Sequence, residues 1–155
     1  MKFREMRRKD KQVMDDMVVE ILANGEYGVL STISENGYPY GVPVNYSYHD
    51  EGIYFHCAKT GHKLDNIKFN DKVSFCIVTD TELEPEEFST KYKSIIAFGT
   101  AAEVEGDEKK KALMKLIEKY AGSQMDKAGN YINKEQSSTV IIKVTLEHIT
   151  GKAKL

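Results

Sequence analysis

The stretch that decides the fold runs from Gly41 to Ile67 and reads GVPVNYSYHDEGIYFHCAKTGHKLDNI. On either side of the turn-forming Asp50-Glu51-Gly52, β-branched and aromatic residues are frequent, which predicts two antiparallel strands. After the second strand, Thr60 is a favourable helix N-cap, and the apolar residues that follow it recur at helical spacing. We therefore predict that a strand pair leads directly into a short helix beginning near Gly61.

The start of this short helix has the properties of an anion site. The first N–H groups of a helix have no internal partner and carry partial positive charge. Gly61 lets a ligand approach the backbone closely, and His62 and Lys63 add side-chain donors at the same point. A phosphate monoester fits this donor set. A lysine that only meets solvent at a helix start is the simpler alternative.

Length and charge restrict the class of protein. The 155 residues, 41% hydrophobic and 30% charged, predict one globular domain over residues 1–155. Lysine and arginine total 22 against 24 acidic residues, so no global field favours nucleic acid, and the basic run at residues 2–11 is interpreted as a solvated arm. Without an apolar run long enough for a membrane span or a signal peptide, we expect a cytoplasmic protein with no membrane partner.

Cysteine and histidine usage does not point to a metal site. Cys57 and Cys76 lie in apolar strand-like runs without CxxC spacing, which predicts buried, reduced thiols. A metal site that combines Cys57 with His49, His56 and His62 is conceivable, but these residues lack any recognised ligand spacing. We therefore expect no metal.

The same patterns predict the remaining elements. Strands are expected at residues 27–34, 38–48, 53–58, 72–79, 93–104 and 139–146. Helices are expected at 10–24, with Asp10 as N-cap and Gly25 as the stop, at 61–69, and from Asp107 to Gly122. We also expect an irregular stretch at 80–87, a helical turn at 88–92 and a flexible loop at 123–136. Asn36-Gly37 is a strong hairpin turn, and residues 93–104 are apolar on both faces, as in a buried strand or one at a subunit interface. Six mainly antiparallel strands predict a mainly β fold, a small β-barrel with helices.

Six motifs carry a family resemblance that covers nearly the whole chain. They are Phe3-Arg4-Glu5-Met6-Arg7-Arg8, the residues from Gly37 to Tyr46, Ile53-Tyr54-Phe55-His56-Cys57-Ala58, Gly61-His62-Lys63-Leu64-Asp65, Ser94-Ile95-Ile96-Ala97-Phe98-Gly99 and Glu147-His148-Ile149-Thr150-Gly151-Lys152. With these motifs the chain resembles the pyridoxamine-5′-phosphate-oxidase-like family of FMN-binding split barrels, and within it the nitroimidazole-resistance proteins.

The resemblance implies a six-stranded antiparallel FMN-binding split barrel that forms a homodimer with FMN at the subunit interface. It also implies roles for ten residues. Val42, Pro43, Val44, Asn45 and Tyr46 would lie along the flavin ring, His56 and Cys57 near the ribityl chain, His62 and Lys63 at the phosphate, and Ser94 would also face the flavin.

Simpler interpretations of several of these residues stay open. Asn45 can pair within its strand, and Pro43 can mark an edge or a bulge. His56 can fill the opposite face of its strand, and Tyr46 can pack in the core. Nothing near Cys57 in the sequence lowers its pKa, so the thiol is not expected to act as a redox nucleophile.

The implied activity is an FMN-dependent oxidoreductase of nitroimidazole-reductase type, which passes electrons from a small donor through FMN to a small acceptor. No catalytic residue can be assigned from the sequence. Two alternatives remain, a non-catalytic flavin-binding or cofactor-binding protein on the same barrel and a pyridoxamine 5′-phosphate oxidase. The second is disfavoured because true oxidases of that type carry a Trp and a basic motif near the C-terminus, whereas this chain has no Trp and closes with the residues from His148 to Leu155.

Overall fold

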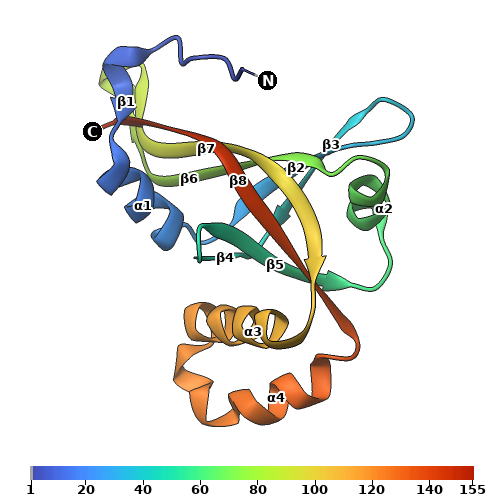
Figure 1. Cartoon of the computed structure of the whole chain (residues 1–155). Coiled ribbons are helices and arrows are strands. Elements are labelled where there is room, and N and C mark those ends of the chain that lie inside the picture. Colours follow the sequence, from blue (N-terminus) through green and yellow to red (C-terminus); the bar gives the residue numbers. More distant parts are fainter. Residues whose placement is uncertain (1) are drawn as a thin grey trace.

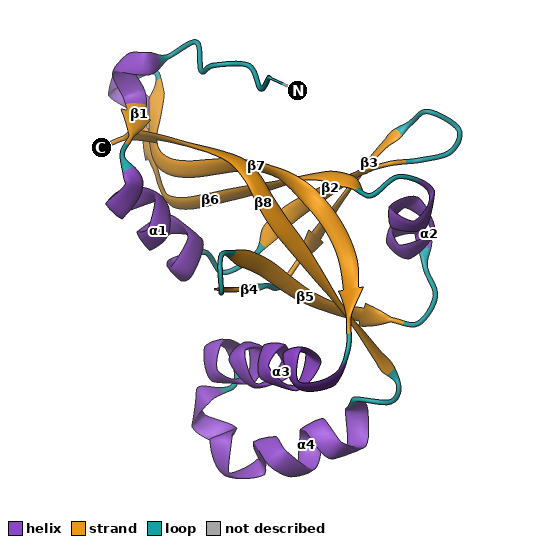
Figure 2. Ribbon diagram, viewed as in Figure 1, coloured by secondary structure: helices purple, strands orange, loops and turns teal. Residues whose placement is uncertain are grey.

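The computed structural model describes residues 2–155, which form one curved antiparallel sheet with helices packed around it (Figures 1 and 2). The strands are β1 (Gln12–Val13), β2 (Gly28–Ile33), β3 (Pro39–Val44), β4 (Ser47–His49), β5 (Gly52–Ala58), β6 (Lys72–Glu84), β7 (Ser89–Val104) and β8 (Thr139–Lys154). The helices are α1 (Asp15–Asn24), α2 (His62–Phe69), α3 (Gly106–Tyr120) and α4 (Ala128–Glu135), with short 3₁₀ segments η1 (Lys9–Lys11), η2 (Pro85–Glu87) and η3 (Gly122–Lys127).

The fold is mainly antiparallel β, as predicted, but within residues 2–155 the sheet contains eight strands and not six. Its strand order is β3-β2-β6-β7-β8-β5-β4, and β1 pairs with β8. The edge strands β3 and β4 follow each other in the chain, separated only by Asn45 and Tyr46. Because so short a link spans at most about 11 Å, it draws the two edges of the sheet together. The sheet therefore curls into a barrel that stays split between β3 and β4.

The predicted single strand over residues 38–48 is broken at Tyr46. The backbone N–H of Tyr46 donates to the hydroxyl of Tyr120 at 3.0 Å, and the same hydroxyl contacts the carbonyl oxygens of Tyr46 and Glu26. A side chain from α3 thus takes the place of a neighbouring strand. The prediction was wrong here because the partner lies 74 residues away in the sequence.

The hairpin between β6 and β7 is longer than predicted. Residues 80–84 continue β6 past a bulge between Thr79 and Glu82, and only η2 is irregular. The helical turn expected at 88–92 is also wrong, since β7 already begins at Ser89. Charged side chains hold this extension together: the Nζ of Lys154, on β8, lies 2.9 Å from a carboxylate oxygen of Glu84. The strand beginning at Thr139 likewise extends to Lys154 and not only to residue 146.

The flexible loop expected at 123–136 is instead η3 followed by α4. Ala128 and Ile132 are buried, and Ile132 packs in a cluster with Leu113 and Leu116 of α3. The two apolar positions of α4 lie four residues apart on one helix face but are separated by Gly129, which weakened the sequence pattern. Helices α3 and α4 together cover the end of the sheet where β5 and β8 lie (Figure 1).

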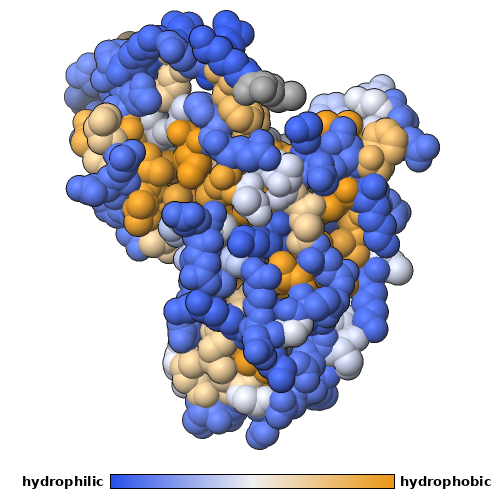
Figure 3. Space-filling model, in the orientation of Figure 1, coloured by the Kyte–Doolittle hydropathy of each residue, from blue (hydrophilic) through white to orange (hydrophobic). Residues whose placement is uncertain are grey.

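The main core lies between α1 and the sheet. Ile21 and Leu22 of α1 pack there with Leu30, Phe75 and other buried strand residues. Helix α1 begins at Asp15 with Met14 as its N-cap, so Asp10 does not cap it, whereas Gly25 ends it as predicted. In the view of Figure 3, apolar residues also reach the surface among hydrophilic ones over the upper part of the sheet.

Gly99 lies at a bulge in the long β7–β8 pair. A Cβ atom at Gly99 would overlap the backbone carbonyl of Thr145 on the neighbouring strand. We expect Gly99→Ala to lower the free energy of unfolding by about 1–3 kcal/mol, because backbone atoms cannot move away as a flexible side chain can. Chemical denaturation measures this. Gly122→Ala is the matched control, since a Cβ there meets nothing within 4 Å, and an equal loss in both variants would contradict the steric explanation.

Candidate functional site

The start of α2 is open and rich in donors, and we call Gly61, His62 and Lys63 the α2 corner. Gly61, and not Thr60 as predicted, occupies the N-cap, and no side chain caps the helix. The N–H of Asp65 donates to the carbonyl of Gly61 at 3.1 Å, so the N–H groups before it have no acceptor within the helix. A Cβ at Gly61, whose φ is +155°, would meet nothing within 4 Å. The corner can therefore take an anion against free backbone donors.

A buried polar network fixes the position of His62. The side-chain amide of Asn66 donates to the hydroxyl oxygens of Thr32 at 2.9 Å and Ser34 at 3.0 Å. Ser34 Oγ lies 3.2 Å from His62 Nε2, and the His62 ring packs on the Tyr40 ring with centroids 3.9 Å apart. Strands β2 and β3 thus hold the first side chain of α2 from two sides.

The same network engages one ring nitrogen of His62. Thr32 Oγ1 accepts from Asn66 and donates to the carbonyl of Tyr40 at 3.4 Å. Ser34 Oγ also accepts from Asn66, and it shares a further hydrogen bond with His62 Nε2 whose donor depends on the His62 tautomer. Because Nε2 is engaged by Ser34, Nδ1 is the ring nitrogen left for a ligand at the α2 corner.

Two predicted ligands on β5 feel the charge of Lys63. His56 is exposed on β5, but partial desolvation by its surroundings lowers its pKa, and the positive charge of Lys63 lowers it further, which favours a neutral imidazole. Burial raises the pKa of Cys57, and the charge of Lys63 only partly offsets this. The positive charge of Lys63 therefore acts on His56 and Cys57 near the C-terminal end of β5. Both cysteines are free as predicted, Cys57 buried and Cys76 half-buried, and a thiol with a raised pKa is a poor nucleophile.

The residues predicted along the flavin ring divide into inward-facing and outward-facing groups. Val42 and Val44 pack against the core, while Pro43 and Asn45 are exposed. Tyr46 is fully buried, and its hydroxyl donates to the carbonyl of Leu22 at 2.7 Å. Since the N–H of Tyr46 is also engaged by Tyr120, neither its side chain nor its backbone N–H is free for a ligand.

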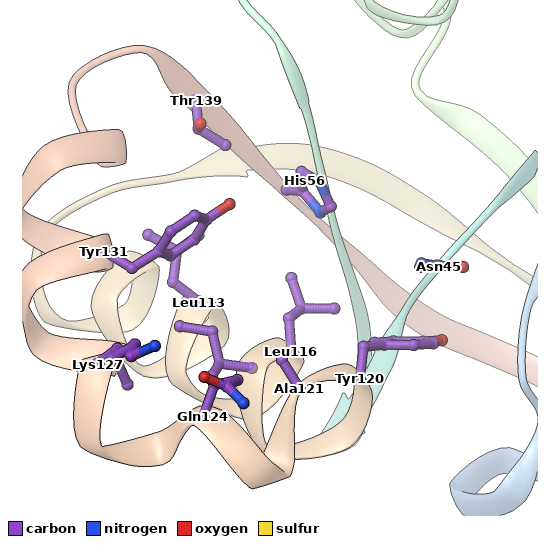
Figure 4. A pocket seen from close by; sticks show the side chains of 12 residues that line it. Asn45, His56, Leu113, Leu116, Tyr120, Ala121, Gln124, Lys127, Tyr131 and Thr139 are labelled. Carbon is purple, nitrogen blue, oxygen red and sulfur yellow. The ribbon is translucent and has the colours of Figure 1, made fainter.

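Asn45 and His56 line a cavity of about 400 Å³ between the sheet and the helices α3 and α4 (Figure 4). Most of its wall is apolar and comes from the helical segment: Leu113, Leu116, Ile117, Ala121, Ala128 and Tyr131. Sequence reasoning predicted a helix from Asp107 to Gly122 and a flexible loop at 123–136 but placed no site on either, so it missed this wall. The sequence of α3 does carry a signal for it, because Ile117 extends the apolar face beyond the buried Leu113 and Leu116.

Ser94 lies apart from these residues. It lines a separate hollow of about 160 Å³ together with Met6, Arg8 and Lys152, and its hydroxyl donates to the carbonyl of Lys152 at 3.4 Å. One chain therefore brings together Lys63, His56 and Cys57 around the end of β5, but it places Ser94 in a different hollow of the surface.

Neither a metal cluster nor a membrane-spanning helix occurs in the described part of the chain. Within residues 2–155, no three His, Cys, Asp or Glu side chains are grouped so that they could hold a metal ion. No helix over the same residues is long and apolar enough to cross a bilayer.

The effect of Lys63 on His56 can be measured directly. We expect Lys63→Gln to raise the pKa of His56 but to leave it below the ordinary histidine value, because partial desolvation still disfavours the charged ring. The pH titration of the His56 ring signals by NMR reports this value. Lys68→Gln, in the last turn of α2, is the matched control and should leave the pKa unchanged. An unchanged His56 pKa in Lys63→Gln would show that the two side chains are not neighbours in solution.

Solved structures of similar fold match nearly the whole chain. A candidate 5-nitroimidazole antibiotic resistance protein from Bacteroides thetaiotaomicron is 22% identical, with a TM-score of 0.75 over 92% of this chain and 86% of that one. A conserved hypothetical protein from Mycobacterium tuberculosis is 17% identical, with a TM-score of 0.82 over 96% and 90% of the two chains. A FAD-binding protein from Mesorhizobium loti is 19% identical, with a TM-score of 0.67 over 94% and 98%.

A family model extends the comparison to the sequence. No curated protein matches the chain. The family model described as pyridoxamine 5′-phosphate oxidase matches residues 14–153, which include every strand from β2 to β7 and nearly all of β8. The curled antiparallel sheet and this match agree with the resemblance drawn from the motifs, and the chain belongs to the pyridoxamine 5′-phosphate oxidase family with its split-barrel fold.

Proposed function

We propose that this protein binds FMN and acts as an oxidoreductase of nitroimidazole-reductase type, which passes electrons from a small donor to a small acceptor. The observation that carries the proposal is the α2 corner, where the unpaired N–H groups of the helix start, Lys63 and the ring of His62 follow one another beside the open space at Gly61. Membership of the family supports a flavin, as does the FAD-binding description of the Mesorhizobium loti protein. When bound, the flavin would supply the redox chemistry.

The donor set of the α2 corner suits a terminal phosphate. A phosphate monoester carries about 1.5 to 2 negative charges at neutral pH and offers three acceptor oxygens. The helix start and the ammonium of Lys63 provide the compensating positive charge, and His62 is held in place for a directed hydrogen bond. All these donors are grouped at one point. This grouping favours the terminal phosphate of FMN over the phosphates of a dinucleotide, which link two nucleosides.

The remaining predicted ligands have narrower roles in this proposal. His56, neutral and next to Lys63, can donate one hydrogen bond to a ribityl hydroxyl or accept one from it. Pro43 and Asn45 are exposed and can meet the flavin ring, whereas Val42, Val44 and Cys57 pack on the core and would support the ring through the backbone. Tyr46 stays in the core and anchors this segment.

A homodimer would explain the position of Ser94. Ile96 and Phe98 on β7 are 46% and 39% exposed, and Val78 on the paired strand β6 is 52% exposed. Ser94 alternates with Ile96 and Phe98, so it lies on the same outer face of the sheet. We propose that a second copy covers this face, which would allow Ser94 to complete the flavin site of the partner. The apolar side chains then become buried in the interface.

The nitroimidazole type of acceptor rests on the motif resemblance and on the likeness to the Bacteroides thetaiotaomicron protein. Pyridoxamine 5′-phosphate oxidation is less favoured, because the chain has no Trp. Reduced nicotinamide consumption that rises when a nitroimidazole is added to the FMN-loaded protein tests the oxidoreductase proposal. Bound FMN without turnover over a panel of donors and acceptors would instead identify a flavin-binding protein without catalysis.

Replacement of Lys63 tests the phosphate position. We expect Lys63→Ala to weaken FMN binding roughly 10- to 150-fold, which is typical for the loss of a charged hydrogen bond to phosphate. Quenching of flavin fluorescence measures the affinity, and the visible spectrum of the purified protein shows whether flavin is retained. Lys68→Ala removes a lysine from the other end of the same helix and should bind FMN normally. Equal affinities in all three proteins would place the phosphate elsewhere.

One charged substitution tests whether the outer face of the sheet is the dimer interface. Ile96→Lys should shift the protein from dimer to monomer in sedimentation velocity, because a lysine would be buried against the apolar face of the partner. The same variant should also lose FMN if Ser94 of one copy completes the site of the other. Val19→Lys is the control, since Val19 is an equally exposed apolar residue on α1. A dimer that survives Ile96→Lys unchanged argues against this face as the interface.

A further inference from the structure

The cavity behind His56 is lined by none of the residues of the α2 corner, although Asn45 and His56, two proposed flavin ligands, are part of its lining. Its volume of about 400 Å³ lies within the range of roughly 300–1,000 Å³ that small-molecule pockets occupy. The wall formed by α3 and α4 presents leucine, isoleucine and alanine side chains together with the ring of Tyr131. Such a wall disfavours a strongly hydrated molecule, because polar groups would lose water without gaining hydrogen bonds.

Apart from the Asn45 amide and the hydroxyl groups of Tyr120 and Tyr131, the polar side chains of the lining stand on two sides of the cavity. Lys127 and Gln124 lie on the helical side, and His56 and Thr139 lie across from them on the sheet side (Figure 4). The two margins are separated by the apolar wall. An occupant therefore needs an apolar body with hydrogen-bonding groups at its two ends.

The lining of the cavity contains a positively charged side chain and no negatively charged one. Among the residues that line the cavity there is one lysine, Lys127, and no Asp or Glu. Lys127 forms no ion pair with any carboxylate of residues 2–155. Lys127 is exposed, so its unpaired ammonium at the rim of the apolar wall favours a ligand with one negative charge over a cation.

The shape of the occupant follows from the aromatic side chains. The ring of Tyr131 is half exposed at the wall, and Tyr120 forms part of the opposite side. Tyrosine rings at a pocket wall favour flat aromatic ligands, which stack offset or edge to face on them.

We propose that this cavity binds a flat aromatic molecule with a single anionic group, such as an aromatic carboxylate, which lies with its anion at Lys127 and Gln124. The far end of this molecule reaches His56, which the proposed function places beside the ribityl chain. The inference rests on that proposed function only for the position of the occupant beside the flavin. Its binding stands on the cavity alone.

The experiment uses 2-naphthoate as probe and its uncharged amide, 2-naphthamide, as the matched ligand, each titrated calorimetrically into the FMN-loaded protein. We expect the wild type to bind naphthoate more tightly than the amide. Lys127→Gln should weaken naphthoate binding at least fivefold and leave amide binding unchanged. Lys134→Gln, on the exposed part of α4, should bind both ligands as the wild type does.

A second variant tests the apolar body of the cavity. Ala121→Phe introduces a ring into the space and should abolish the binding of both ligands, while FMN affinity stays within twofold of the wild type. If Ala121→Phe removes FMN together with the probes, the cavity belongs to the flavin and the inference is overturned. Because Lys127→Gln changes only an exposed side chain, it remains decisive if Ala121→Phe unfolds.

The two proposals fail in different ways. Wild-type protein that binds FMN but neither naphthoate nor the amide overturns the cavity inference alone. Protein that binds naphthoate in a Lys127-dependent manner but never takes up FMN overturns the proposed flavin function and supports the cavity. Equal affinity for naphthoate and the amide contradicts the assignment of Lys127.

Discussion

The structure depends on one hydrogen-bonded contact: the hydroxyl of Tyr120 binds the backbone N–H and carbonyl of Tyr46, where a neighbouring strand would otherwise bind them. The contact breaks the second hairpin strand, and the break lets β3 and β4 form the two edges of one curled sheet. It also fixes the end of α3 against the barrel, so the cavity wall has a defined position. Lys119 completes this junction: its ammonium lies 3.7 Å above the Tyr46 ring, and burial lowers its pKa to about 8.

Two different environments adjoin β5. On one side of β5, the α2 corner offers backbone N–H groups and charged donors to an anion. On the other side, α3 and α4 offer an apolar wall with a single cation at its margin. His56 is common to both, since it lines the cavity and its pKa is lowered by Lys63. The sheet thus brings a polar and an apolar site into contact through one side chain.

Local patterns could predict much of the fold because their partners are near in sequence. The Asn36-Gly37 hairpin, β5 and the start of α2 are set by turn residues and periodicity within a dozen positions. The break at Tyr46 depends on a residue 74 positions away, and α4 depends on burial of two side chains against α3. The same holds for the site. Local motifs predicted Lys63 and His56, whereas the wall of the cavity could be recognised only once the packing of α3 and α4 was known.

The shared histidine implies that the two sites are coupled, with a sign that follows from the charges. Lys63 disfavours the protonated form of His56. An anion at the α2 corner cancels that field, so the pKa of His56 rises when the corner is filled. The proposed cavity ligand meets His56 with its uncharged end, so it would sense this change through a hydrogen bond to the ring and not through its own anion. Because coupling is reciprocal, a ligand that accepts a hydrogen bond from the protonated ring would in turn favour an anion at the α2 corner.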